Sequence, residues 1–243
     1  MPHDNGKRPR PRVVAVDTCT TSCSVAALNG GKERVELVFE SRQTHTRHLM
    51  EMVAQALVAV HLEIEQIDLL AVTRGPGSFT GLRIGISTVM GLRAATSVPA
   101  VGFSSLEVLA HQAVGPAPWI VPMIDARRDE VYFSLFRATE SGVERVAPDQ
   151  VGAPDAVALP DAGPVLFISN GAAGYRSAIE ARHGRQARFA SPASSTIHAL
   201  TVAQCALARF VKNAAKPVED LAPVYLRKSD AEINRQAAPA DLP

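Results

Sequence analysis

The 243-residue sequence lacks a long apolar run, a cysteine framework and an excess of charge of either sign. No predominantly apolar stretch without charge reaches the roughly 18 to 20 residues that a membrane helix needs, and the N-terminus lacks the apolar core and cleavage site of a signal peptide. Only three cysteines occur, an odd number that does not suit a set of disulfides. We therefore expect a cytoplasmic protein with free thiols and no contact with a membrane.

Positive charge is concentrated at the N-terminus. The formal net charge of the chain is +1, and four basic residues against one acidic residue give +3 to the first 12 residues, which leaves −2 for the rest. A protein that binds RNA by itself usually gathers Lys and Arg on one face, where they contact the phosphate backbone. The composition therefore disfavours independent RNA binding, although a neutral total can conceal a basic patch of the folded chain.

Several enzyme signatures are missing as well. The sequence contains no HExxH, GxSxG or CxxC motif, so the familiar signatures of metalloproteases, serine hydrolases and thiol redox proteins are absent. Residues 74–85, RGPGSFTGLRIG, are rich in glycine, but Leu82 follows Gly81 where a Walker A loop has lysine. The glycines are also too widely spaced for a dinucleotide-binding fingerprint. This segment predicts a Gly-Pro turn that leads into a tightly packed helix.

The pattern of apolar residues indicates two similar parts. Residues 1–12 have the composition of a disordered basic arm. The first part then predicts three strands, a helix at about 45–61, a strand, a helix at about 79–95 and a final strand. The opening then repeats, because WIVPMIDARR and EVYFSLFRA resemble VVAVDTCTT and CSVAALNG. Two such parts predict a duplicated α/β fold with mixed sheets flanked by helices and a cleft between the halves. This is the plan of the actin, hexokinase and Hsp70 superfamily.

The remaining elements follow the same reasoning. A strand is expected at VLFISNG, and helices are expected near 175–182 and 195–212. We expect the N-terminal half to span residues 13–105, the C-terminal half 106–218 and a tail 219–243.

An aspartate ends the first strand of each half. In actin-like ATPases the aspartate at this place faces a metal-bound phosphate, and a following glycine lets the backbone approach closely. Asp17 and Thr18 occupy that turn here, but Cys19 stands where the glycine is common, and Asp125 is the counterpart in the second half. An aspartate that caps a turn is the favoured interpretation in both halves, so a nucleotide site would be weak and vestigial.

The two helices of the first half carry more apolar or small residues than one buried face needs. Met50, Ala54 and Val58 form a second apolar strip on the helix at 45–61. The helix at 79–95 contains three glycines, each of which costs roughly 1 kcal/mol relative to alanine and permits close approach of a backbone. We therefore predict a surface for a partner helix. The residues expected in it are Leu49, Met50, Val53, Ala54, Gly81, Gly85, Thr88 and Val89.

Potential metal ligands do not gather in the sequence. His45 and His48 lie three residues apart, but no carboxylate or third histidine completes a site near them. Cys19 and Cys23 have no second pair to complete a zinc site. We expect no metal site in this chain.

Five segments resemble the TsaB (YeaZ) family, in the family's order and from about Val13 to Asp230. They are DTCTTSCSVAAL, THTRHL, RGPGSFTGLRIGISTVMGLRAA, IDARRDEVY and PVYLRKSD, of which GPGSFTGLRIG is the most specific. The resemblance implies an actin-like fold shared with TsaD, the catalytic subunit that transfers a threonylcarbamoyl group to adenosine 37 of tRNA. It also implies binding to TsaD, assembly with the ATPase TsaE, and a homodimer when TsaD is absent. ATP and metal are then expected on the partner subunits, and tRNA is contacted only through the complex.

The comparison with TsaD also implies a lost metal site. In that family two histidines four residues apart hold the metal, in a segment that follows the strand corresponding to PAVGF. Ser105 and Leu109 stand at those places here, and leucine cannot ligate a metal.

The resemblance therefore implies a non-catalytic dimerisation or scaffold subunit with no tightly bound cofactor. The alternative is an ATP-dependent kinase of a small metabolite with the same fold, using Asp17 and Asp125 around MgATP. A substrate-dependent ATP turnover by the isolated chain would distinguish the two. A peptidase is a third possibility, but the sequence shows no nucleophile and base to support it.

Overall fold

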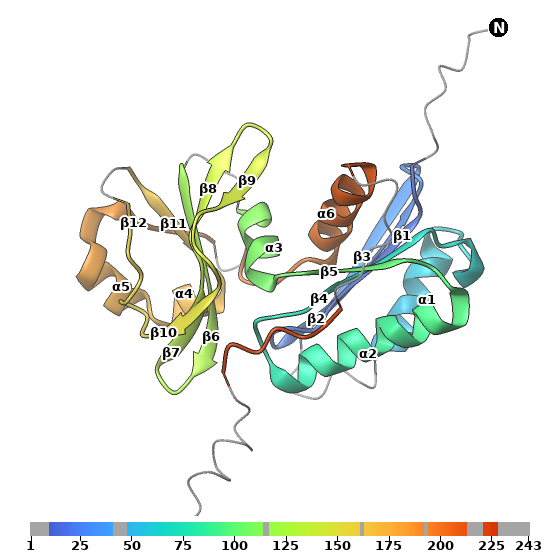
Figure 1. Ribbon diagram of the computed structural model, residues 1–243, viewed down its shortest axis with the longest axis horizontal. Coiled ribbons are helices and arrows are strands. Elements are labelled where there is room, and N and C mark those ends of the chain that lie inside the picture. Colours follow the sequence, from blue (N-terminus) through green and yellow to red (C-terminus); the bar gives the residue numbers. More distant parts are fainter. Residues whose placement is uncertain are drawn as a thin grey trace, which may run out of the picture.

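The computed structural model shows two β-sheets set side by side, with helices on their outer faces and two helices between them (Figure 1). The structure describes residues 10–40, 48–113, 117–160, 163–191, 194–212 and 221–227. Mixed sheets in two similar halves confirm the predicted α/β class. Within the described residues, no helix combines the length and the apolar character needed to cross a membrane.

The first sheet has the strand order β3-β2-β1-β4-β5. Its central strand β1 pairs antiparallel with β2 and parallel with β4. All residues of β1 and β4 are buried, because helices cover both faces of the sheet. The predicted strands are confirmed with the bounds β1 Val13–Asp17, β2 Ser22–Asn29, β3 Glu33–Glu40, β4 Leu69–Thr73 and β5 Ala100–Phe103.

Two helices cover one face of this sheet. Helix α1 (Leu49–Ala59) buries residues at helical spacing, and α2 (Phe79–Thr96) follows the short 3-10 helix η2 (Ile64–Gln66) and β4. Both helices share a core with alternate residues of β1, β2 and β4. The side chain of Ser78 accepts a hydrogen bond from the backbone N–H of Gly81, which caps the start of α2.

The second sheet repeats the first, with the order β10-β7-β6-β11-β12. Strand β6 pairs antiparallel with β7 and parallel with β11, as β1 does with β2 and β4. The prediction of a single strand for EVYFSLFRA is wrong, because this segment forms two strands, β7 and β8. Between them the backbone carbonyl of Leu135 accepts hydrogen bonds from Val146 and Ala147, and the strand is interrupted there. The strands are β6 Trp119–Arg127, β7 Glu130–Phe133, β8 Phe136–Thr139, β9 Gly142–Arg145, β10 Gln150–Gly152, β11 Val165–Ile168 and β12 Ala187–Phe189.

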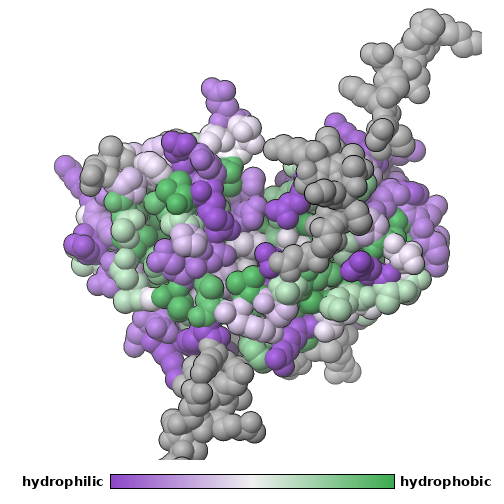
Figure 2. Space-filling model, in the orientation of Figure 1, coloured by the Kyte–Doolittle hydropathy of each residue, from purple (hydrophilic) through white to green (hydrophobic). Residues whose placement is uncertain are grey.

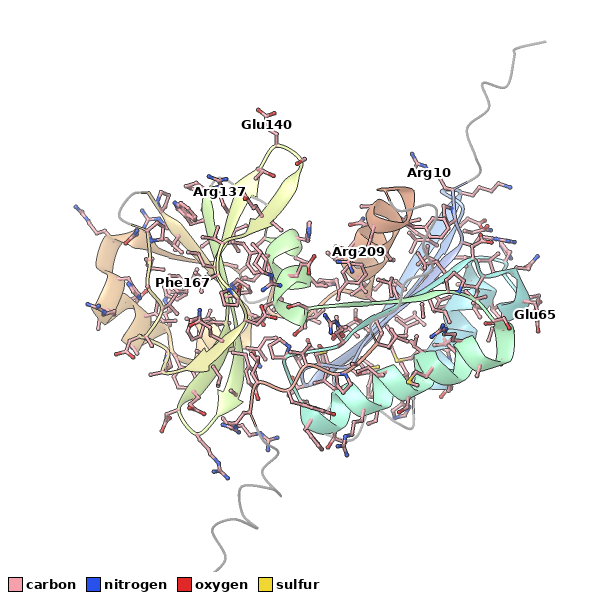
Figure 3. The ribbon with its side chains drawn as sticks, viewed as in Figure 1. Arg10, Glu65, Arg137, Glu140, Phe167 and Arg209 are labelled. Carbon is pink, nitrogen blue, oxygen red and sulfur yellow. The ribbon has the colours of Figure 1, made fainter. Side chains whose placement is uncertain are left out.

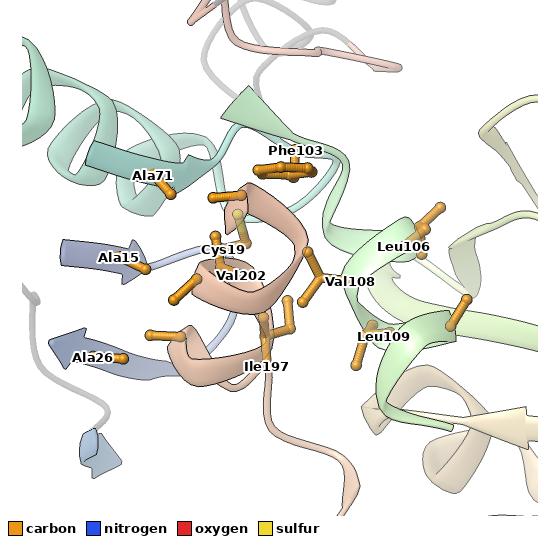
Figure 4. Packing of buried hydrophobic residues seen from close by; sticks show 14 of the residues in the cluster. Ala15, Cys19, Ala26, Ala71, Phe103, Leu106, Val108, Leu109, Ile197 and Val202 are labelled. Atoms are coloured by element: carbon orange, nitrogen blue, oxygen red, sulfur yellow. The ribbon is translucent and has the colours of Figure 1, made fainter. Parts of the chain in front are cut away.

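The helix that follows each sheet packs on the other sheet. Helix α3 (Ser105–Gln112) follows β5 but lies against β6, and α6 (Ala199–Lys212) follows β12 but lies against β1, β2 and β4. Val202 of α6 lies among Ala15, Ala26 and Ala71 of the first sheet, with Val108 of α3 beside it (Figure 4). The space in which a cleft was predicted is therefore occupied by two helices and a common core. The predicted division at residue 105 placed α6 with the C-terminal half, whereas this helix packs on the N-terminal sheet.

The second half is covered on its outer face by short helices. They are α4 (Asn170–Gly174), α5 (Arg176–His183) and the 3-10 helix η3 (Gly184–Gln186), which leads into β12. Helix α5 buries only Ile179 within its length and leaves the rest of its surface exposed or half-buried. The sequence reasoning located α5 and α6 but missed α4 and the short strands β9, β10 and β12.

Residues 221–227, which we call the C-terminal strap, run from the first half to the second (Figure 1). The backbone N–H of Val224 donates to the carbonyl of Arg74 over 2.7 Å. The ring of Tyr225 lies 4.8 Å from that of Phe79, measured between centroids. At the other end, Arg227 forms an ion pair of 2.9 Å with Glu130 of β7. The strap thus connects the β4–α2 loop with the β6–β7 hairpin.

The predicted disordered arm, residues 1–12, includes a residue that belongs to the fold. Arg12, which we assigned to the disordered arm, donates hydrogen bonds to both carboxylate oxygens of Asp68 and one from its backbone N–H. Its carbonyl accepts from the backbone N–H groups of Asp68 and Leu69. Arg12 therefore belongs to the fold, while the prediction for residues 1–9 concerns residues outside those described.

Candidate functional site

The turn after β1 is closed to solvent. Asp17 and Thr18 are fully buried, so neither side chain reaches the surface. The hydroxyl of Thr73, at the end of β4, donates to Oδ1 of Asp17 over 2.5 Å, and the backbone N–H of Cys19 donates to the same oxygen over 3.3 Å. Thr18 donates from its hydroxyl to the carbonyl of Gly81 over 2.7 Å. The Thr18 hydroxyl and one carboxylate oxygen of Asp17 are thus hydrogen-bonded to neighbours in their own chain.

The carboxyl group of Asp17 is fully buried, which is unusual for a charged side chain. Its Oδ2 atom is buried and accepts no hydrogen bond from the described residues. Burial raises the pKa of Asp17 to about 6, and the bonds from Thr73 and Cys19 offset only part of that effect. Burial also raises the pKa of the Cys19 thiol well above its usual value, which makes it an unreactive group.

The start of α2 forms the cover over this turn. A Cβ atom built on Gly81 would lie 2.0 Å from the carbonyl oxygen of Thr18, and one built on Gly85 would lie 2.4 Å from the Thr18 hydroxyl. Gly77 approaches the carbonyl of Cys19 in the same way, at 2.3 Å. We predicted close approach to a partner for the glycines of this helix, but at Gly81 and Gly85 the approaching backbone is that of the same chain.

Asp125 lies at the equivalent place in the second half but is exposed. Its Oδ1 accepts a hydrogen bond of 2.8 Å from the backbone N–H of Arg127, and its own N–H donates to Asn170 over 3.1 Å. The turn that follows holds Arg127, Arg128 and Asp129 at positive φ angles of 62°, 55° and 58°. Asp125 therefore caps a hairpin turn, which is the structural role favoured from the sequence.

The two aspartates do not form one open phosphate site. A metal-bound phosphate needs oxygens that it can reach, and the only Asp17 oxygen without a hydrogen bond is sealed beneath α2. The residues at this turn consequently do not fit MgATP. Sequence reasoning missed Thr73; the available signal was a polar residue at the end of a buried strand that is the parallel neighbour of β1.

Ser105 and Leu109 have structural contacts. The hydroxyl of Ser105 donates to the carbonyl of Pro76, and its backbone N–H donates to the carbonyl of Gly75 over 3.0 Å. Leu109 is fully buried in the core between the halves. Among the described residues, no three His, Cys, Asp or Glu side chains gather in a way that could hold a metal ion.

The residues predicted for a partner surface divide into two groups. Leu49, Val53 and Val89 lie in the core of the first half, and Gly81 and Gly85 are buried against Thr18. Met50 and Ala54 are exposed, and Thr88 is half-buried. The surface itself stays a prediction, but only this second group is accessible in the folded chain.

Exposed apolar side chains extend this second group. Met50 is 50% exposed, Val58 73% and Met90, on α2, 54%. We give the name α1–α2 strip to the set of Met50, Ala54 and Val58, which follow one another at four-residue spacing on α1, and Thr88 and Met90 of α2. Pale green residues follow α2 along the lower edge of the molecule in Figure 2.

Comparison with known proteins agrees with these features. The family model described as TsaD, tRNA N6-adenosine threonylcarbamoyltransferase, matches residues 39–235. The tRNA threonylcarbamoyladenosine biosynthesis protein TsaB of Escherichia coli is 37% identical over 134 residues, which cover 54% of this chain and 58% of that protein. That match therefore spans little more than half of the E. coli protein's length.

Solved structures extend the comparison to most of the chain. YeaZ from Pseudomonas aeruginosa superimposes with a TM-score of 0.77 at 31% identity, covering 89% of this chain and all of that one. Component A of (R)-2-hydroxyglutaryl-CoA dehydratase from Acidaminococcus fermentans, at 13% identity and a TM-score of 0.51, covers 85% of this chain and all of its own and shares the actin-like fold. The chain therefore belongs to the family that the TsaD model describes and, within it, to the TsaB (YeaZ) group.

Proposed function

We propose that this chain is a non-catalytic subunit that supports a TsaD-type transferase in forming threonylcarbamoyladenosine at adenosine 37 of tRNA. The observation that carries the proposal is the sealed turn at Asp17 in a member of this family. Thr18 and Asp17 are buried and hydrogen-bonded within the chain, and leucine stands at an expected metal-ligand position. A family member built in this way would depend on a partner for ATP, metal and transfer chemistry.

The α1–α2 strip is the surface that we assign to the partner. Exposed Met50, Val58 and Met90 side chains would be covered favourably by another apolar helix surface. A two-fold pair of such helices would form a four-helix contact, which suits either a second copy of this chain or a TsaD homologue of similar fold. Homodimer formation and TsaD binding are then mutually exclusive.

The rest of the assembly follows from the same proposal. A TsaE homologue would supply ATPase activity, and tRNA would be bound by the complex rather than by this chain alone. We place the complex in the cytoplasm because its proposed substrate is tRNA. The alternative, a small-metabolite kinase, is disfavoured because the Asp17 turn has no opening for MgATP.

A capture experiment tests the partner surface. The double substitution Met50→Glu with Val58→Glu places two carboxylates on the strip, and we expect at least a tenfold loss of affinity for a tagged TsaD homologue and for the homodimer, because the charges would be buried without partners. Val146→Glu is the matched control, since Val146 is 51% exposed but lies in the second half. Binding would be measured by light scattering and calorimetry.

The outcome is informative only for a folded variant. Circular dichroism and thermal unfolding should match the unsubstituted chain, because both replaced side chains are exposed. If the folded double variant bound the TsaD homologue as tightly as the Val146→Glu control, the α1–α2 strip would not be the interface. If the purified chain alone transferred threonylcarbamoyl groups to tRNA, the non-catalytic assignment would be wrong.

A further inference from the structure

Arginine is concentrated at the end of the second half. Residues 176–188 include Arg176, Arg182, Arg185 and Arg188 with a single acidic residue, Glu180, which gives +3 to a stretch of 13 residues. Because the whole chain carries +1, all other residues together carry −2. The nearly neutral composition therefore conceals a basic region, which we call the α5–β12 arginine face.

The arginine face lines shallow hollows. One hollow of about 580 Å³ is lined by Arg176, Arg185, Arg188 and Phe189, among others. A neighbouring hollow of about 440 Å³ is lined by Pro164 together with the same Arg185 and Arg188. Since they share two arginines, the hollows form a continuous basic depression, and nitrogen-bearing side chains point outward from α5 (Figure 3).

Two arginines of the face are held in position. The Nε of Arg176 donates to Glu180 over 2.8 Å, and its guanidinium lies 4.5 Å from the centroid of the Phe189 ring. The Nη1 of Arg188 donates to the carbonyl of Arg185 over 2.9 Å. These contacts orient the two guanidinium groups at the depression and leave further N–H donors for a ligand.

The other two arginines have no acidic partner among the described residues. Arg182 lies in the last turn of α5, where a cation is favourable because of the helix dipole. That effect does not extend to Arg185, which follows the helix. Asp155 lies close enough to His183 to raise the pKa of that ring, whereas burial and Arg182 lower it. Most of the positive charge is therefore uncompensated.

We propose that the α5–β12 arginine face binds the phosphate backbone of RNA, and that in the proposed function this RNA is the tRNA held by the complex. Arginine is suited to phosphate because its planar guanidinium donates two parallel hydrogen bonds. The depression is open and its arginines are exposed, which suits an extended phosphodiester chain better than a small enclosed anion. The face also lies at the opposite end of the molecule from α1 and α2, so a partner on the α1–α2 strip leaves it accessible (Figure 1).

Binding of labelled tRNA to the complex with a TsaD homologue tests the assignment. The substitutions Arg182→Ser and Arg185→Ser remove two charges without breaking a described ion pair. We expect the Kd near 0.1 M salt to rise about tenfold, and the slope of log K against log salt to become shallower by about 1.5, because each phosphate contact contributes about 0.7 to 0.9. The matched control replaces Lys32 and Arg34 by serine, which removes the same charge at the start of β3, again without breaking a described ion pair.

The results separate this proposal from the preceding one. If the complex forms and modifies tRNA while the Arg182, Arg185 variant shows the same Kd and salt slope as the control, the arginine face is not an RNA contact. Failure to bind the TsaD homologue would instead contradict the proposed function, and the chain alone would then be titrated with tRNA. Binding of inorganic phosphate that the variant loses, with tRNA affinity unchanged, would assign the face to a small anion and overturn the RNA proposal.

Discussion

The two halves share a sheet order but treat the end of their first strand differently. In the first half Asp17 lies beneath α2 and is fully buried, whereas Asp125 in the second half is exposed and caps a hairpin. The covering helices differ in the same way, because α2 has 18 residues and α4, at the corresponding place, has five. The repeated strand order thus places the two aspartates at equivalent positions. The length of the covering helix determines whether each aspartate is accessible to a ligand.

The largest expected effect comes from the glycines that allow this cover. Gly81→Ala should lower the free energy of unfolding by about 3 kcal/mol or more, because the new Cβ would lie 2.0 Å from the Thr18 carbonyl oxygen. Gly171→Ala, the counterpart at α4, should cost less, about 1 to 2 kcal/mol, since its nearest atom would be at 2.9 Å. Urea unfolding of both variants measures the difference.

Gly91→Ala is the control within α2 itself. No atom lies within 4 Å of its added Cβ, so the substitution should stabilise the protein by about 0.5 to 1 kcal/mol through helix propensity. Equal losses for Gly81→Ala and Gly171→Ala would mean that the first half is not sealed more tightly than the second.

The next effect concerns the pH dependence of stability. The folded-state pKa of Asp17 is raised to about 6, so the folded protein binds its proton more tightly than the unfolded chain does. This residue therefore lowers stability as the pH rises from about 4 to 6, by an amount on the order of 3 kcal/mol, and the effect is then constant. Asp17→Asn should remove that component from urea unfolding measured between pH 4 and 7.

Asp125→Asn provides the comparison with the second half. Asp125 is exposed, and we expect its substitution to change stability by no more than about 0.5 kcal/mol. An Asp17→Asn protein whose stability followed the same pH curve as the unsubstituted chain would show that Asp17 is not buried as the structure has it.

A smaller effect than that of Asp17→Asn tests the connection between the halves. Tyr225→Ala removes the ring packed on Phe79 and the hydroxyl that accepts from Arg83 over 3.1 Å, and should cost about 1 kcal/mol. Tyr225→Phe keeps the ring and should cost less than half as much. Thermal unfolding would compare them; if the two substitutions cost the same, the ring does not hold the strap to the first half.

Sequence patterns predicted the elements that have strong periodicity or burial. The strands β1 and β4 were recognised as short unbroken apolar runs, and the helices α1, α2 and α6 were recognised from their helical pattern. The strands β10 and β12 have three residues each, which is too short to show a period. The interruption between β7 and β8 depends on a hydrogen bond to a distant segment, and local pattern cannot reveal it.

The site was predictable in its position but not in its accessibility. Asp17 and Asp125 were located as equivalent residues from the repeat of the opening motif. Gly81 and Gly85 face Thr18 because of the way α2 is rotated about its axis, which the sequence does not reveal. A glycine that packs inside one chain has the same sequence pattern as a glycine at an interface between two chains. The arginine face was hidden because η3 brings Arg185 and Arg188 together with α5, while net charge averages over the whole chain.

The C-terminal strap and the helices α3 and α6, each of which packs on the sheet of the other half, also limit motion between the two halves. Hinge motion needs a seam that few contacts cross. Here α3 and α6 pack across the seam between the two halves, Glu107 of α3 lies close to both Arg145 of β9 and Arg209 of α6, and Arg227 joins the strap to β7. The two halves should therefore behave as one rigid body. A partner bound to the first half would then fix the distance and orientation of any ligand bound to the second half.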